Sequence, residues 1–192
     1  MGNMVRTVAV LTLLCAFSGF ILSYLKNVTA PAIEEQLLVN VQGPAIAMVF
    51  NNAENNPLHE RHVFTRANGE SVTVFPCKVG NRLTGVAIEN FGKGYGGPVG
   101  VIVGFNIMND SLAGIGMTTL KETPGLGMRV KEFSFRKQFR NMETPVALSA
   151  QGGKVDAIAG ATISSTGVVL AVNSASEVYR ELKPEILKKW DN

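Results

Sequence analysis

Three hydroxyl side chains lie close together where a helix is expected to begin. Thr162 directly follows a turn of small residues at 159–161, Ala-Gly-Ala, and Ser164 and Ser165 come within the next few positions. Residues 164 to about 182 carry apolar side chains at helical spacing, which predicts a helix there. The start of a helix exposes unpaired backbone N–H groups and the positive end of the macrodipole, and both attract a phosphate. A hydroxyl at this point is therefore a candidate for contact with a phosphate group.

The same hydroxyls have a purely structural interpretation. Ser and Thr oxygens commonly cap helices by accepting hydrogen bonds from the first free backbone N–H groups. On this segment alone, helix capping is the interpretation that we favour. A ligand site needs support from elsewhere in the chain.

Two glycine-rich segments lie earlier in the sequence. Residues 92–100 read G-K-G-Y-G-G-P-V-G, and residues 121–127 read K-E-T-P-G-L-G. Gly-Gly-Pro and Pro-Gly are turn signals, because glycine reaches positive φ and proline fixes φ. Glycine also lets a backbone lie close against a flat ligand. Each segment is predicted to be a loop, and each taken alone is compatible with an ordinary hairpin.

Taken together and in this order, the three segments resemble the signatures of the FMN-binding subunits of bacterial Rnf and Nqr respiratory complexes. Those signatures are a G-Y-x-G-P stretch, an E-T-P-G-L-G stretch and an S/T-G-A-T motif whose threonine carries FMN through a phosphoester bond. Here Ala159 replaces the first Ser or Thr, while Gly160, Ala161 and the acceptor Thr162 match. The resemblance spans almost the whole chain. It is strongest to the G subunit of Rnf, and the C subunit of the sodium-pumping NADH:quinone reductase is a near sibling.

The resemblance implies a set of cofactor-binding residues around covalent FMN on Thr162. Leu126 is expected to offer an apolar face to the isoalloxazine ring and Thr123 a hydrogen bond. Lys121 has two interpretations, stabilising negative charge on the reduced ring or being a solvated lysine at a strand end. Tyr95 likewise flanks the ring or anchors its loop. The remaining expected members of the site are Gly160, Ala161, Ser164, Ser165, Glu122, Gly125 and Gly127.

Asp156 precedes the turn and also has two interpretations. In the first it has a role at the site, either aligning the turn or binding the metal that a flavin transferase needs during attachment. In the second it is only a surface residue. No metal site of the protein itself is expected. Cys15 and Cys77 form no C-x-x-C pair, and His59 and His62 lie in a polar segment far from both in sequence.

The resemblance implies an electron-transfer subunit of an ion-translocating ferredoxin:NAD oxidoreductase. Its expected partners are other membrane subunits and, during maturation, the flavin transferase. Three alternatives stay open: a C subunit of the sodium-translocating reductase, a stand-alone tethered flavin carrier or reductase, and a non-redox binding module. A ferredoxin-type cysteine run and a G-x-G-x-x-G between strand and helix are absent from the sequence, so NADH and ferredoxin are expected to react elsewhere. The formal charge of +3 is too small to indicate nucleic-acid binding.

Residues 7–25 are predicted to be a transmembrane helix. They contain no charged residue, and Arg6 and Lys26 bracket them. A helix of about 20 residues spans the ~30 Å hydrocarbon core. A cleavable signal peptide is the main alternative, but the apolar run exceeds the typical ~7–15 residues of such a peptide and lacks a small-residue cleavage site. Arg6 favours a cytoplasmic N-terminus, which places residues 27–192 on the extracytoplasmic side of the bacterial inner membrane.

The rest of the pattern predicts an α+β fold, an antiparallel sheet with helices packed on one face. The expected parts are a tail at 1–6, the anchor at 7–25, a helical linker at 26–60 and an FMN-binding domain at 61–192. In the linker, Thr29 is expected to cap a helix and Gly43-Pro44 to end it. Residues 51–71 are expected to be loop. Strands are expected at 71–75, 78–79, 83–89, 98–105 and 112–120, and helices at 132–141 and 164–182.

Overall fold

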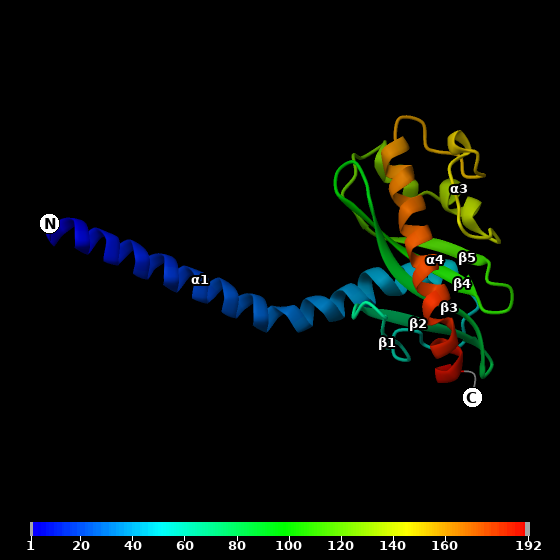
Figure 1. The fold of residues 1–192 in the computed structure, drawn as a ribbon, viewed down its shortest axis with the longest axis horizontal. Helices are drawn as coiled ribbons and strands as arrows, with labels where there is room; N and C mark the ends of the chain where they lie inside the picture. The colour runs from blue at the N-terminus through cyan, green and yellow to red at the C-terminus, as the bar shows by residue number, and fades with distance from the viewer. Residues whose placement is uncertain (1, 191–192) are drawn as a thin grey trace. The chain divides into compact units, whose positions relative to one another are not determined.

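The computed structural model describes residues 2–190, which form two units divided between Asn40 and Val41. The first unit is dominated by α1 (Gly2–Leu37), a single long helix (Figure 1). Its side chains are exposed, including Leu11, Phe17 and Phe20. An 18-residue window within the apolar N-terminal helix has a mean hydropathy of 2.2, so it is long and apolar enough to cross a membrane. The predicted anchor at 7–25 lies inside this helix.

The predicted break near Thr29 is wrong. The helix α1 continues through Thr29 and contains Pro31, and the Thr29 hydroxyl donates to the carbonyl of Leu25 (2.8 Å) instead of capping a new helix. A π-helical segment, η1 (Leu38–Gln42), follows, and α2 (Gly43–Val49) begins at the Gly43-Pro44 pair that was expected to end a helix.

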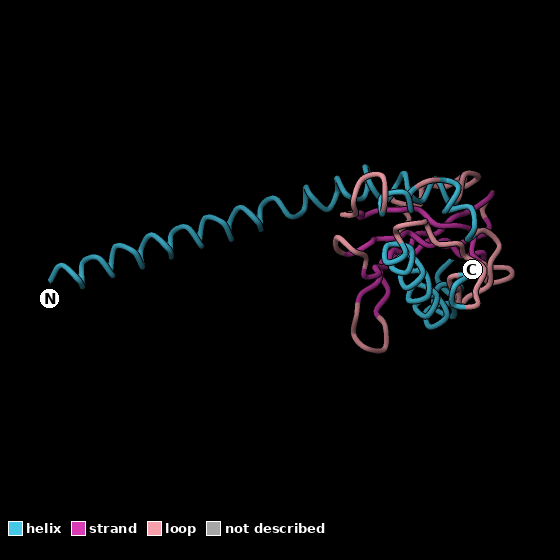
Figure 2. Tube along the Cα trace, turned by 90° about the horizontal axis from the view of Figure 1, so that it is seen from above, coloured by secondary structure: helices cyan, strands magenta, loops and turns pink. Residues whose placement is uncertain are grey.

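The second unit is built on one five-stranded antiparallel sheet in the order β1-β2-β3-β4-β5. Its strands are the magenta segments of Figure 2. The strands are β1 (His62–Thr65), β2 (Ser71–Val79), β3 (Arg82–Lys93), β4 (Pro98–Asn106) and β5 (Leu112–Leu120). The antiparallel sheet is confirmed. The loop predicted over 51–71 is wrong at β1, which is a short edge strand. Only Phe64 is buried in β1, so the strand lacks the alternation of buried and exposed residues by which a strand is recognised in sequence.

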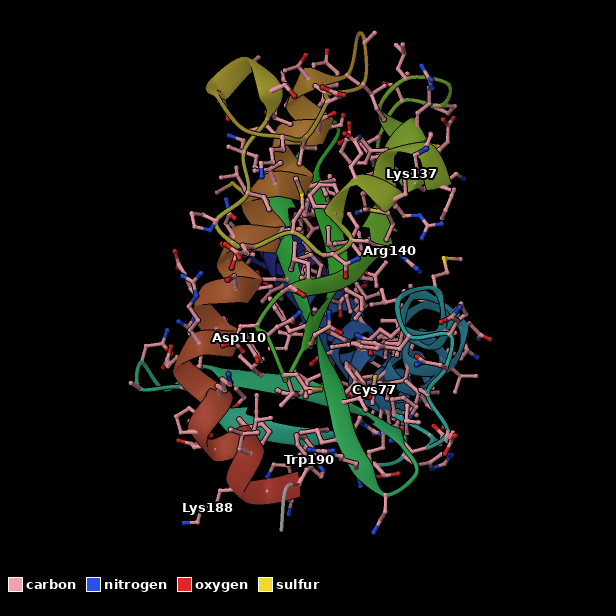
Figure 3. The ribbon with its side chains drawn as sticks, turned by 90° about the vertical axis from the view of Figure 1, so that its right-hand side faces the viewer. Cys77, Asp110, Lys137, Arg140, Lys188 and Trp190 are labelled. Atoms are coloured by element: carbon pink, nitrogen blue, oxygen red, sulfur yellow. The ribbon has the colours of Figure 1, made fainter. Side chains whose placement is uncertain are left out.

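The cysteine and the two histidines of the second unit bear on its possible chemistry. Cys77 in β2 is fully buried (Figure 3). Burial raises the pKa of the Cys77 thiol to about 12, which leaves it protonated and unreactive at neutral pH. His59 and His62 are both exposed.

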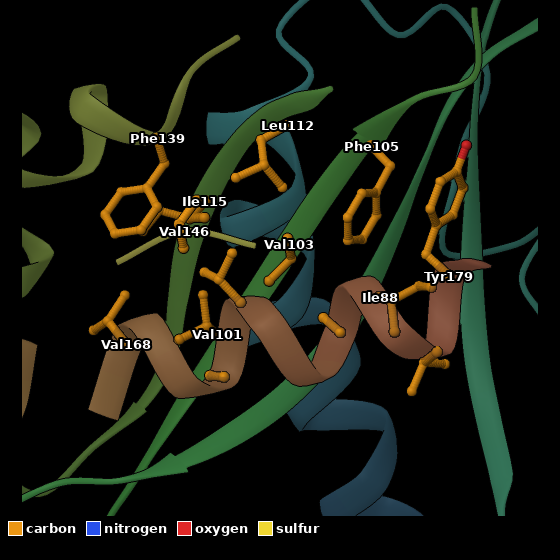
Figure 4. Packing of buried hydrophobic residues seen from close by; sticks show 14 of the residues in the cluster. Ile88, Val101, Val103, Phe105, Leu112, Ile115, Phe139, Val146, Val168 and Tyr179 are labelled. Carbon is orange, nitrogen blue, oxygen red and sulfur yellow. The ribbon is translucent and has the colours of Figure 1, made fainter. Parts of the chain in front are cut away.

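The helix α4 (Thr162–Trp190) packs along one face of the sheet, against β3 and β4 (Figure 1). It starts two residues before the predicted helix and runs past its predicted end at about 182. The predicted apolar stripe is confirmed, since its members are all buried, and the Tyr179 ring stacks on Phe105 (Figure 4). The stripe consists of Val168, Val172, Ala175, Tyr179 and Leu182.

A helix also covers the opposite face of the sheet. The prediction that helices pack on one face only is therefore wrong. On β4, Phe105 faces α4, so its neighbour Gly104 points the other way. A Cβ built on Gly104 would lie 2.3 Å from the Val49 side chain of α2, and one on Gly116 would lie 2.6 Å from the Ala45 carbonyl. The helix α2 therefore packs within the second unit, which begins at Val41 rather than at the predicted boundary of 61.

Short helical turns replace the helix predicted at 132–141. They are η2 (Gly127–Lys131), α3 (Phe133–Arg136) and η3 (Lys137–Phe139), and a further turn, η4 (Ser149–Gln151), follows later. Phe135 and Phe139 are buried as expected, whereas Phe133 is exposed. Glu132 has an extended backbone and Asn141 a positive φ of 59°, so regular helix is interrupted on both sides.

Candidate functional site

One pocket of the second unit brings the three motif segments together. Tyr95 comes from the loop between β3 and β4, residues 122–127 from the segment after β5, and residues 160–164 from the turn and first residues of α4. The pocket has a volume of about 560 Å³. That size lies within the range of about 300–1,000 Å³ typical of small-molecule and cofactor sites. The lining residues are Tyr95, Glu122, Thr123, Leu126, Gly127, Gly160, Ala161, Thr162, Ile163 and Ser164.

Three residues expected at the site do not line this pocket. Lys121 is exposed at the end of β5, and its carbonyl packs against Gly96. Gly125 has a φ of 76° and supplies the turn after Pro124. Ser165 is fully buried, where its hydroxyl donates to the Ala161 carbonyl (3.0 Å) and accepts the N–H of Ile158 (3.1 Å). Ser165 thus fixes the turn from inside the domain.

The turn before α4 presents Thr162 to solvent. Gly160 has a φ of 77°, a conformation that favours glycine, and the Ala161 N–H donates to the Ile158 carbonyl (2.9 Å). Thr162 is the first residue of α4. It therefore lies within the helix, whereas the sequence placed it before a helix that begins at 164. Within residues 2–190 its hydroxyl has no hydrogen-bond partner, while its carbonyl accepts the Thr166 hydroxyl (2.9 Å).

The rim of the pocket is apolar and exposed. Tyr95 is 74% exposed, Ile163 54% and Leu126 47%, so each leaves much of its surface uncovered by the domain. Ile163 was missed at the sequence level, because an apolar residue between two hydroxyl residues gives no sign that it points outward. Together the three side chains suit a flat, largely apolar ligand.

Glu122 occupies the wall of the pocket and is only 6% exposed. Its Oε1 accepts the backbone N–H of Gly96 (3.0 Å), and its Oε2 accepts the hydroxyl of Ser164 (2.5 Å). Ser164 is itself 2% exposed. The structure therefore joins two predicted site residues to one another.

Asp156 lies outside the pocket lining. Its carboxylate accepts the Ser149 hydroxyl (2.7 Å), and the Gln138 side chain bonds both its backbone N–H (2.7 Å) and its carbonyl (3.2 Å). These contacts hold the segment that leads into the turn. They fit the interpretation of Asp156 as a residue that aligns this part of the chain.

Comparison with known proteins agrees with this geometry. Residues 94–177 match the FMN-binding domain family. The G subunit of the proton-translocating ferredoxin:NAD(+) oxidoreductase complex of Clostridium ljungdahlii is 28% identical over 87% of this chain and 86% of its own length. The G subunit of the ion-translocating oxidoreductase complex of Methanosarcina acetivorans is 38% identical, over 48% of this chain and half of its own length.

A solved structure shares the fold. It is the C subunit of the Na(+)-translocating NADH-quinone reductase of Parabacteroides distasonis, with a TM-score of 0.52 and 24% identity over 60% of this chain and 64% of that chain. The family match at 94–177 contains every residue that lines the pocket. Residues 94–177 thus match the FMN-binding domain family, and the chain that carries them is similar to the G subunits of ion-translocating oxidoreductase complexes.

Proposed function

We propose that this chain is the membrane-anchored flavoprotein subunit of an Rnf-type ion-translocating ferredoxin:NAD oxidoreductase. It carries FMN joined to Thr162 and passes electrons within the complex. The observation that carries the proposal is the pocket itself, which lies within the segment that matches the FMN-binding family. It gathers three separate motif segments around one exposed hydroxyl that has no hydrogen-bond partner within residues 2–190. The similarity to the G subunit from Clostridium ljungdahlii over 87% of the chain supports the same assignment.

The residues of the pocket suit the two chemically different ends of FMN. The first turn of α4 offers free backbone N–H groups and the positive end of the helix macrodipole to a phosphate, next to the Thr162 hydroxyl. Tyr95, Leu126 and Ile163 offer exposed apolar surface to the ring. When bound, FMN supplies reversible electron transfer, and the protein holds and orients it.

Covalent attachment is the finer part of the proposal, and it has a physical rationale. The domain belongs on the extracytoplasmic side of the inner membrane, where a dissociable cofactor would be lost to dilution. A hydroxyl that is free, exposed and fixed at a helix start is suited to a phosphoester bond. A flavin transferase is then a partner during maturation, and the polytopic subunits of the complex are partners afterwards.

The C subunit of a sodium-translocating NADH:quinone reductase is the second candidate, and the shared fold favours it. Co-purification of the tagged chain separates the two. An Rnf-type subunit is expected to bring down the other subunits of a ferredoxin:NAD oxidoreductase, and a C subunit to bring down those of a sodium-translocating NADH:quinone reductase. A stand-alone carrier is expected to bring down none.

Intact mass of the denatured chain tests the proposal directly. The chain is produced with and without a co-expressed flavin transferase, and both samples are denatured before mass measurement and in-gel fluorescence. We expect an FMN mass increment and flavin fluorescence only in the co-expressed sample. Fluorescence that disappears on denaturation would mean that the flavin is not covalently bound, and no flavin in either state would reject the cofactor itself.

A further inference from the structure

Glu122 is a buried acid whose two oxygens contact two different parts of the site. Gly96, which donates to Oε1, lies in the β3–β4 loop, and Ser164, which donates to Oε2, lies in the first turn of α4. Both oxygens act as acceptors, as they do in the ionised form of the side chain. A buried carboxylate without such donors would be strongly destabilising. One side chain therefore joins all three motif segments.

The glycines around Glu122 make room for this carboxylate. A Cβ on Gly94 would lie 2.3 Å from Oε1, and a Cβ on Gly127 would lie 2.5 Å from Oε2 and 2.6 Å from the Ser164 hydroxyl oxygen. A Cβ on Gly96 would lie 2.0 Å from the Lys121 carbonyl. None of these three glycines has a positive φ, so lack of space and not backbone conformation excludes a side chain there.

Glu122 takes part in none of the ion pairs formed within residues 2–190. Its carboxyl group instead lies beside Ser164, in the first turn of α4, where the helix macrodipole is positive. Thr162 lies two positions before Ser164 in that same turn. The hydrogen bond from Ser164 thus fixes the backbone that carries the exposed hydroxyl.

We propose that Glu122 is a positioning residue for flavin loading, an inference that rests on the proposed function of Thr162 as the FMN attachment site. It holds the start of α4 at a set distance from the two glycine loops, so that the pocket has its shape before FMN arrives. Preorganisation of this kind removes the cost of ordering loops at the moment of binding. The glycines of both loops are, on this account, packing partners of the Glu122 carboxylate.

The test measures the rate of FMN attachment to the full-length protein purified without flavin. Purified transferase and its flavin donor are added, and the FMN mass increment is followed with time. We expect Glu122→Ala to slow attachment about tenfold or more, because misplacement by about 1 Å can cost about 10²-fold in rate. Glu122→Gln is expected to restore most of the rate, since its amide oxygen accepts from Gly96 and its amide N–H donates to Ser164.

A matched control is available in β3. Glu89 also accepts hydrogen bonds at both oxygens, from the Thr118 hydroxyl and the Gln42 side-chain amide, but it does not line the pocket. Glu89→Ala is expected to lower the melting temperature of the flavin-free protein, as Glu122→Ala does, without slowing attachment. Hydrogen exchange at the Gly96 amide is expected to accelerate in Glu122→Ala and to stay unchanged in Glu89→Ala.

Ser164→Ala removes only the hydrogen bond from Ser164 to Glu122. It replaces Glu122→Ala in the test if that variant does not fold. We expect it to slow attachment as well. Equal slowing in the Glu89 and Glu122 variants, or a Gln variant as slow as the Ala variant, would reduce Glu122 to a general contributor to stability. Failure of the wild-type protein to load at all would count against the proposed function, whereas wild-type loading matched by Glu122→Ala would count against this inference alone.

Discussion

At the scale of single residues, the three hydroxyls at the start of α4 have different environments. Ser164 and Ser165 are buried and have protein partners, whereas Thr162 is exposed and has none within residues 2–190. Sequence spacing alone could not separate them, because their burial depends on how α4 packs against the rest of the domain. The structure therefore leaves Thr162 as the hydroxyl that is free to react.

Thr162→Ala is expected to abolish covalent FMN and to stop electron transfer through the complex. Folding is expected to change little, because even a lost capping hydrogen bond costs only about 1 kcal/mol, and the Thr162 hydroxyl makes no hydrogen bond within residues 2–190. Thr166→Ala, one helical turn later, is the matched control and is expected to load normally. Peptide mapping that finds the FMN increment on another residue, or retention of the increment in Thr162→Ala, would reject the assignment.

Leu126→Asp tests the apolar rim of the pocket. Leu126 is 47% exposed and lies beside Gly160, so a charge there is expected to alter the flavin absorption spectrum or reduction potential while leaving attachment intact. Leu170→Asp is the control, since Leu170 is 48% exposed on α4 and does not line the pocket. A spectrum and potential equal to wild type in both variants would remove Leu126 from the ring-binding surface.

At the scale of secondary-structure elements, the long and periodic parts were predictable from sequence. The strands β2 to β5 and the stripe of α4 were predicted because alternation and helical spacing persist over many residues. The edge strand β1, the packing of α2 and the short turns between 127 and 139 were not, because tertiary contacts determine them. The same holds within the site: the motifs indicated which segments meet, but the contacts of Glu122 and Ser165 depend on packing.

Asp110 ties the β4–β5 turn to α4, and this contact predicts a pH dependence. Its carboxylate accepts the Tyr179 hydroxyl (2.6 Å) and the Lys183 ammonium (2.5 Å). Burial opposes ionisation of Asp110, but hydrogen bonds from Lys183 and Tyr179, with the charges of Lys183 and Arg180, outweigh it and leave the pKa of Asp110 below its ordinary value. The stabilisation is therefore present above about pH 4 and is lost as pH falls through the lowered pKa.

Asp110→Asn is accordingly expected to destabilise the domain at neutral pH by roughly 1 kcal/mol or less, because this side chain is half exposed. Asparagine tolerates the backbone here, where φ is 57°. The difference in melting temperature from wild type is expected to shrink from about pH 7 to about pH 3 as Asp110 itself becomes protonated. A difference that stays constant with pH would show that the ionised form has no special role.

At the scale of the whole molecule, the chain combines an apolar helix with a separately packed domain that matches the FMN-binding family. The helix α1 buries none of its side chains, so its apolar surface needs a membrane or other protein helices to cover it. The domain contains the whole pocket. Attachment of FMN within the domain and anchoring by α1 are thus expected to be separable properties.

Charge at the N-terminus predicts the orientation of the chain in the membrane. Arg6 and the terminal amine lie on one side of the apolar run, and positive charge is retained on the cytoplasmic side, so the domain is expected outside the cytoplasm. Protease added to spheroplasts should digest the domain and leave the membrane-embedded part of α1 protected. N-terminal sequencing of the purified protein should show that α1 is retained. A reporter fused after Asn192 that is active only in the cytoplasm would reverse the orientation, and with it the reason for covalent attachment.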